Sequence, residues 1–197
     1  EIKNTEIFYF DASNSNSVED FANRIRGLTV SYYIQFHGDA IPDDDLESQT
    51  FSKLDSLFKI NSFSNVILLK SILPRMKVQN FGRILLMSTA SSEYGGGQSS
   101  FGYGLSKHSI IFLTKYLAKY YTHYNILTNC VSPGLFLTDF HTKRMNRTSE
   151  QMENRIKSIR LGRSGTLKEI SDLIYYLTFV NSYISGESFK IDGADFI

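Results

Sequence analysis

Two side chains at helical spacing could carry out acid–base chemistry. Tyr103 and Lys107 lie four residues apart in a segment, 101–121, whose apolar pattern predicts one long helix. Residues four apart share a helix face, so the ammonium of Lys107 would lie within one turn of the phenol of Tyr103. A nearby positive charge favours the phenolate and lowers the pKa of the phenol. A tyrosine tuned in this way can pass a proton to or from a carbonyl oxygen.

This spacing by itself is weak evidence for an active site. The chain contains twelve tyrosines, so a match to Tyr-x-x-x-Lys arises easily by chance. The alternative interpretation is a surface tyrosine beside a solvated lysine. The elements that would position the pair, and the segments around them, decide between the two interpretations.

Apolar runs alternate with longer helical patterns along the chain. The expected strands span 7–10, 28–36, 83–87, 126–131 and 188–191, and the expected helices span 17–26 (with Ser17 as N-cap), 51–76, 101–121 and 167–179. Strands that alternate with helices of this length imply a parallel sheet covered on both faces. We therefore expect one α/β domain over residues 1–197, with three α/β/α layers.

Composition narrows the function classes. The formal net charge of +1 gives no reason to expect a nucleic acid or a charged membrane surface as partner. No run of about 18 apolar residues is present, so no membrane span is expected. The single cysteine, Cys130, lies in an apolar stretch and is expected to be a buried thiol, which suits a cytoplasmic setting. With one cysteine and four scattered histidines, no metal site is expected.

The segment around Tyr103 resembles the active-site motif of the short-chain dehydrogenase/reductase family, and other segments match that family in order. They are 57–61 (LFKIN) with 73–76 (LPRM), 82–89 (GRILLMST), 129–134 (NCVSPG), and 161–163 (LGR) with 191–193 (IDG). The resemblance covers essentially the whole chain. It implies a Rossmann-like doubly wound parallel sheet, NAD or NADP as cofactor, and a small-molecule carbonyl or alcohol as substrate.

The resemblance also implies catalytic roles. Tyr103 would be the general acid/base, and Lys107 would lower its pKa and hydrogen-bond the nicotinamide ribose. Asn61 would anchor a water in the proton relay. The family's serine falls on Thr89, whose hydroxyl can donate the same hydrogen bond. Ser88 and Ser91 stay open as alternatives for that hydroxyl.

Cofactor contacts follow from the same resemblance. Pro133, Gly134 and Thr138 would position the nicotinamide. Asp11 matches the acidic residue, after the third family strand, that contacts adenine. Gly38 is kept from the Asn-Asn-Ala-Gly turn that lies near the adenosine half of the cofactor.

Two departures from the family pattern stand out. Residues 35–38 read QFHG, so that turn keeps only its glycine, and His37 could be a pH-sensitive contact or a backbone hydrogen-bonding group. The family also begins with a glycine-rich strand–turn–helix that cradles the pyrophosphate, and this sequence has no such segment. The first strand–helix–strand unit is therefore missing from this chain. We expect roughly 50 further N-terminal residues in the natural protein, since a βαβ unit needs 30 or more.

Three other features of the sequence allow different interpretations. The acidic run 43–45 predicts a solvated turn. A serine hydrolase would need Gly-x-Ser-x-Gly, and the nearest string, 104–108, lacks the last glycine. A non-catalytic binding or scaffold subunit is the stronger alternative.

Association with further copies of the chain is also expected. Helix 101–121 has more apolar surface than one core side needs, which predicts a homodimer or homotetramer unless one subunit buries the helix entirely. In the resembling family, this helix and the one ending near Met76 form a four-helix dimer contact. The variable segment 135–159 would hold the substrate, and its residues allow an apolar or an anionic one.

Overall fold

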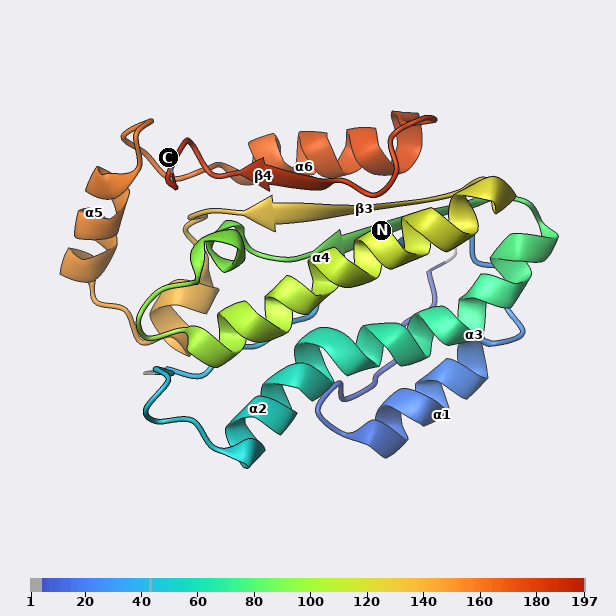
Figure 1. Ribbon diagram of the computed structural model, residues 1–197, viewed down its shortest axis with the longest axis horizontal. Helices are drawn as coiled ribbons and strands as arrows, with labels where there is room; N and C mark the ends of the chain where they lie inside the picture. Colours follow the sequence, from blue (N-terminus) through green and yellow to red (C-terminus); the bar gives the residue numbers. More distant parts are fainter. Residues whose placement is uncertain (1–4, 43, 197) are drawn as a thin grey trace.

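The computed structural model describes residues 5–42 and 44–196 and contains one parallel sheet (Figure 1). Its strands, in sheet order, are β1 (Tyr32–Ile34), β2 (Gly82–Met87), β3 (Ile126–Pro133) and β4 (Ser188–Ile191). Every residue of β2 is buried, as expected of a parallel strand that is covered on both faces. The predicted parallel sheet is confirmed.

Helices cover both faces of this sheet. The helices α1 (Ser15–Ile25), α3 (Ser64–Val78) and α4 (Phe101–Tyr121) pack on one face, and α6 (Leu167–Tyr175) packs on the other, as Figure 1 shows. Side chains alternate along β2 accordingly. Ile84 and Leu86 join the core under the first three helices, whereas Leu85 and Met87 join the core under α6. This is the three-layer, doubly wound architecture that the sequence predicted.

The predicted strand at 7–10 is wrong. Those residues alternate, since Phe8 and Phe10 pack towards Phe21 of α1 while Ile7 and Tyr9 are 93% and 90% exposed. In the described part of the chain, however, no strand hydrogen-bonds with them. An extended segment becomes a strand only when a neighbour supplies the ladder of hydrogen bonds.

Several predicted boundaries also differ. The first helix is capped by Asn14 rather than Ser17, because the Asn14 side chain accepts hydrogen bonds from the first backbone amides. The strand predicted over 28–36 is only Tyr32–Ile34. The last helix, predicted over 167–179, continues from α6 into a π-helical turn, Tyr176–Val180.

Two predicted segments contain additional helical elements: the helix predicted over 51–76 and the polar segment 138–159. The helix consists of α2 (Phe51–Phe58), a π-helical turn (Lys59–Phe63) and α3. The polar segment contains a π-helical turn (Phe140–Arg144) and α5 (Ser149–Ser158). The sequence signal for α5 was its capping box, in which Thr148 and Gln151 bond each other's backbone amides.

Two further predictions concern the single cysteine and membrane-spanning helices. The thiol of Cys130 is free and buried, as predicted. Within the described ranges, no helix combines the length and the apolar character that crossing a membrane requires.

Candidate active site

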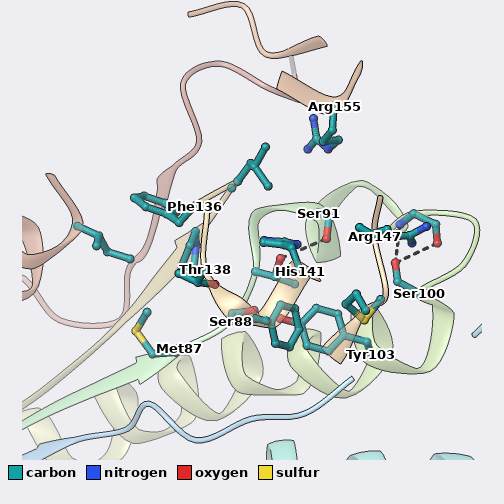
Figure 2. Close-up of a pocket in the computed structure, with 18 of the residues that line it drawn as sticks. Met87, Ser88, Ser91, Ser100, Tyr103, Phe136, Thr138, His141, Arg147 and Arg155 are labelled. Carbon is teal, nitrogen blue, oxygen red and sulfur yellow. Dashed lines mark hydrogen bonds between the residues drawn. The ribbon is translucent and has the colours of Figure 1, made fainter. Parts of the chain in front are cut away.

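A cavity of about 640 Å³ opens at the carboxyl edge of the sheet. Its lining includes Phe36, which follows β1, Met87 at the end of β2 and Pro133 at the end of β3. Ligands of open parallel sheets bind beyond the carboxyl ends of the strands. The volume lies within the usual range of small-molecule sites, roughly 300–1,000 Å³. Figure 2 shows side chains from β2, α4 and the segment after β3 around this cavity.

Tyr103 reaches the cavity from the first turn of α4, where Asp44 holds it. The backbone N–H of Tyr103 donates to Asp44 Oδ2 at 3.0 Å, and the side chain of Asp44 is fully buried. The predicted solvated turn is therefore wrong for Asp44, because its carboxylate satisfies a free amide at a helix N-terminus. Asp45 accepts from the backbone of Ser48, and Asp43 lies outside the described residues.

Burial controls the acidity of Tyr103. It raises the pKa of the phenol to about 12, and a hydrogen bond with the Thr89 hydroxyl acts in the opposite direction. The ring lies 5.9 Å from the ring of Phe140, centroid to centroid. The expected lowering of this pKa by Lys107 is thus wrong for this arrangement, since desolvation of the phenolate dominates.

Lys107 lies beneath the cavity rather than in its lining. Its side chain is buried, and its ammonium donates to the carbonyl of Met87 at 3.0 Å. Burial lowers the pKa of Lys107 to about 8. A Cβ built on Gly38 would lie 2.7 Å from Lys107 Nζ, so only glycine allows the backbone to pass this close to the ammonium.

Asn61 fastens the turn that contains Gly38. The residue lies in the π-helical turn Lys59–Phe63, a geometry that is frequent at functional sites. Its amide group donates to Asp39 O and to Ser106 Oγ, both at 2.9 Å, and accepts from Asp39 N at 2.8 Å. These bonds bring Asn61, Gly38 and Lys107 together. The expected water anchor stays a prediction.

Three hydroxyls of the 88–91 segment line the cavity, and their partners differ. Ser88 is buried and donates to the backbone carbonyl of Lys107 at 2.8 Å. Thr89 Oγ1 lies 3.2 Å from Ser91 Oγ, and the Thr89 hydroxyl lowers the pKa of Tyr103. Of the three, Thr89 is the one coupled directly to the phenol of Tyr103.

The predicted cofactor residues are only partly brought together. Pro133, Gly134 and Thr138 line the cavity, whereas Asp11 is not among its lining residues. The carboxylate of Asp11 accepts from the backbone and hydroxyl of Ser13, at 2.9 Å and 2.7 Å. The predicted contact of Asp11 with adenine stays a prediction.

The segment after β3 forms the outer wall of the cavity, and three of its arginines bond to other parts of the molecule. Arg144 forms an ion pair with Asp39, and Arg155 forms one with Asp195. Arg147 donates to Ser99 Oγ at 2.8 Å. Each of these contacts joins residues at least 40 apart in sequence, so no local sequence pattern could predict them.

Known proteins with similar sequences and folds are numerous. A family model described as enoyl-(acyl carrier protein) reductase matches residues 1–193. Dehydrogenase/reductase SDR family member 6 of Rattus norvegicus is 28% identical over 192 residues, which cover 93% of this chain and 75% of that protein. The 3-oxoacyl-(acyl-carrier-protein) reductase FabG of Buchnera aphidicola subsp. Acyrthosiphon pisum is 28% identical over 188 residues, covering 94% of this chain and 75% of that protein.

Solved structures give the same fold. A 3-oxoacyl-(acyl-carrier-protein) reductase from Agrobacterium tumefaciens C58 with NADP bound superimposes with a TM-score of 0.84 at 22% identity, over 93% of this chain and 71% of that one. A gluconate 5-dehydrogenase from Burkholderia cenocepacia J2315, in complex with NADP and tartrate, gives a TM-score of 0.84 at 17% identity, over 94% and 73%. At these identities the likeness concerns the fold alone.

Proposed function

Because the chain belongs to the short-chain dehydrogenase/reductase family, we propose that it is an NAD(P)-dependent oxidoreductase that interconverts a carbonyl and an alcohol. Tyr103 acts as the general acid/base in this proposal. The observation that carries it is that Tyr103 and Thr89 line one cavity, from α4 and from just after β2, where the Thr89 hydroxyl lowers the pKa of the Tyr103 phenol. The NADP in both fold neighbours supports the cofactor class.

The residues at the carboxyl edge fit a nicotinamide cofactor. Thr138 offers a hydroxyl and Pro133–Gly134 offer backbone carbonyls, and these groups suit a carboxamide. The ammonium of Lys107 is buried beneath the cavity, close to Gly38, and its hydrogen bond to a ribose hydroxyl stays a prediction. When bound, the cofactor supplies or accepts the hydride. The chain's own residues orient the reactants and move the proton.

Proton transfer follows from the state of Tyr103. With a pKa of about 12 the phenol is protonated at neutral pH, which is the form that donates. In reduction, Tyr103 and Thr89 would each donate a hydrogen bond to the carbonyl oxygen, and the Tyr103 proton would pass to the alkoxide oxygen as it forms. In oxidation the same phenolate oxygen would take the proton back. Lys107 and Asn61 support the backbone near the reacting groups, since Lys107 bonds the Met87 carbonyl and Asn61 bonds the Asp39 carbonyl.

One experiment tests the proposal. NADH and NADPH would be titrated by fluorescence into the natural full-length protein, and cofactor oxidation would then be followed with a panel of small ketones. Tyr103→Phe is expected to lower kcat about 100-fold to 10,000-fold and to leave the cofactor Kd unchanged. Tyr183→Phe, at a side chain that is 95% exposed and outside the cavity lining, is the matched control and keeps full activity. A protein that binds neither cofactor and oxidises none would instead be a non-catalytic binding subunit. Undiminished turnover by Tyr103→Phe would show that another group is the acid/base.

We further propose that the enzyme associates with copies of itself through α4. Three aromatic side chains form a stripe on that helix, with Phe112, Tyr116 and Tyr120 exposed to 71%, 47% and 48%. Their rings contact one another in succession. A contiguous apolar patch of this kind is typical of an interface.

A further inference from the structure

The outer wall of the cavity combines an apolar surface with positive charge. Segment 135–159 contributes Leu135, Met145 and Met152 to the lining, together with Arg147 and Arg155. Among the described residues that line the cavity there is no aspartate or glutamate. Figure 2 shows both arginines among the side chains around the cavity that contains Tyr103. A binding site of this composition selects for charge as well as for shape.

The two arginines differ in their partners. Arg155 is paired with Asp195, whose side chain is buried, so much of its charge is compensated. Arg147 is half-buried and donates to the neutral hydroxyl of Ser99. Within residues 5–42 and 44–196, no carboxylate forms an ion pair with Arg147. A partly desolvated guanidinium with a neutral partner is well suited to bind an anion.

Arg147 is also fixed close to the reacting groups. Its backbone N–H donates to the carbonyl of His141 at 3.0 Å, and its side chain reaches Ser99, just before α4. Tyr103 lies in the first turn of that helix. Besides burial, the positive charges of Arg155 and Arg147 lower the pKa of His141, so the cavity wall carries a positive potential at neutral pH.

We infer that the substrate is an oxo or hydroxy acid: its carboxylate binds Arg147, its apolar part contacts Leu135, Met145 and Met152, and its carbonyl or hydroxyl faces Tyr103. This inference rests on the proposed function, because it assumes that Tyr103 marks the reacting end of the cavity. A carboxylate matches the planar guanidinium in a bidentate geometry, which a neutral substrate cannot reproduce.

The test separates this inference from the proposed function. Calorimetric titration of hexanoate and of hexanamide into the NADPH-saturated natural protein measures anion binding without turnover. Initial rates with 5-oxohexanoate and its methyl ester measure selectivity. Arg147→Gln is expected to weaken hexanoate binding and to raise the KM for 5-oxohexanoate, each about tenfold to a hundredfold, with the methyl ester changed less than about twofold. Arg147→Lys keeps part of the effect, and Arg160→Gln, an exposed arginine outside the cavity, has none.

The opposing outcomes are distinct. Equal affinity for hexanoate and hexanamide, or hexanoate binding that Arg147→Gln leaves unchanged, overturns the inference and leaves the oxidoreductase proposal standing. A rise in the NADPH Kd of Arg147→Gln also overturns it, because the arginine would then belong to the cofactor site. Failure to bind both NADH and NADPH removes the proposed function and this inference with it.

Discussion

The carboxylate of Asp44 accepts a hydrogen bond from the backbone N–H of Tyr103 at 3.0 Å, across 59 positions of sequence. A second side chain, Gln49, donates to the same carboxylate. Glycine at position 102 makes room for the arrangement, because a Cβ there would lie 3.0 Å from Asp44 Oδ2 and 2.8 Å from Leu57 Cδ1. The first turn of α4, and with it the proposed acid/base, is therefore held by a loop that belongs to another part of the chain.

Removing this carboxylate should misplace Tyr103. Asp44→Ala leaves the amide of Tyr103 without its partner in a buried site, so we expect the free energy of unfolding to fall by about 2–3 kcal/mol. We also expect kcat to fall about tenfold to a hundredfold, because a small misplacement of a reacting group costs that much. Chemical denaturation and initial-rate kinetics measure the two effects.

The controls for Asp44 use its neighbours. Asp45→Ala, which changes a carboxylate bonded to Ser48, is expected to leave kcat unchanged. In the double variant Asp44→Asn with Gln49→Glu, the oxygen of the new asparagine accepts from Tyr103 and its amide donates to the new glutamate, so the donor and the acceptor of the 44–49 bond are exchanged. Most of the kcat lost in Asp44→Ala should therefore be present in this variant. If Asp44→Ala kept the wild-type kcat while losing stability, Asp44 would have no role in positioning Tyr103.

Removing each of the three hydroxyls near the end of β2 should affect kcat and stability differently. Thr89→Val removes the cavity hydroxyl that lowers the pKa of Tyr103 and should lower kcat about tenfold to a hundredfold with little loss of stability. Ser88→Ala removes a second, buried hydrogen bond to the Lys107 carbonyl, which keeps its helical partner, and should instead cost about 0.5–1.5 kcal/mol of stability. Ser91→Ala serves as the mild control. A larger drop in kcat for Ser91→Ala than for Thr89→Val would reassign the catalytic hydroxyl to Ser91.

His37 should make the fold sensitive to acid. Burial, and then the charge of Lys107, lower its pKa from an ordinary 6.5 to about 4. Its ring nitrogen lies 2.9 Å from Ser64 Oγ, and not against a backbone group. As pH falls from 6.5 towards 4, the unfolded chain takes up a proton that the folded chain refuses. Stability is therefore lost in that window, by about 3 kcal/mol at most.

The measurement for His37 is a comparison of unfolding curves at pH 7 and pH 4.5. Carboxylates also titrate in this range, so the informative quantity is the difference between wild type and His37→Gln, which should lose less stability on acidification. His108→Gln, at an exposed position, should follow the wild type. Equal acid sensitivity of His37→Gln and wild type would mean that His37 takes up its proton as easily in the folded chain as in the unfolded chain.

The sequence predicted those elements whose signals are local. The helix over 101–121 and the strand over 188–191 match the structure at both ends, because apolar patterning and flanking turn residues mark them. The segment 7–10 has the alternation of a strand but lacks a hydrogen-bonding neighbour in the described part of the chain. Pattern alone cannot supply that partner.

In the site, too, local sequence features were predictable and contacts between distant segments were not. Spacing placed Tyr103 and Lys107 on one helix, and that is what the structure contains. Spacing could not reveal that the Lys107 ammonium bonds the Met87 carbonyl, or that burial raises the pKa of Tyr103. The role of Asp44 depends on a contact between distant segments, and its acidic neighbours suggested a solvated turn instead.

The aromatic stripe on α4 predicts self-association that one substitution can disrupt. Phe112→Asp puts a charge at one end of the exposed apolar surface formed with Tyr116 and Tyr120, so burying that surface against another copy would desolvate a carboxylate. We expect the dissociation constant of the oligomer to rise at least about a hundredfold, which sedimentation velocity over a concentration series would show. Tyr183→Asp alters a side chain that is 95% exposed elsewhere and should keep the wild-type mass. If Phe112→Asp also kept the wild-type mass, another face would have to form the oligomer. If the wild-type protein sedimented as a monomer at micromolar concentration, the aromatic stripe would not mediate self-association.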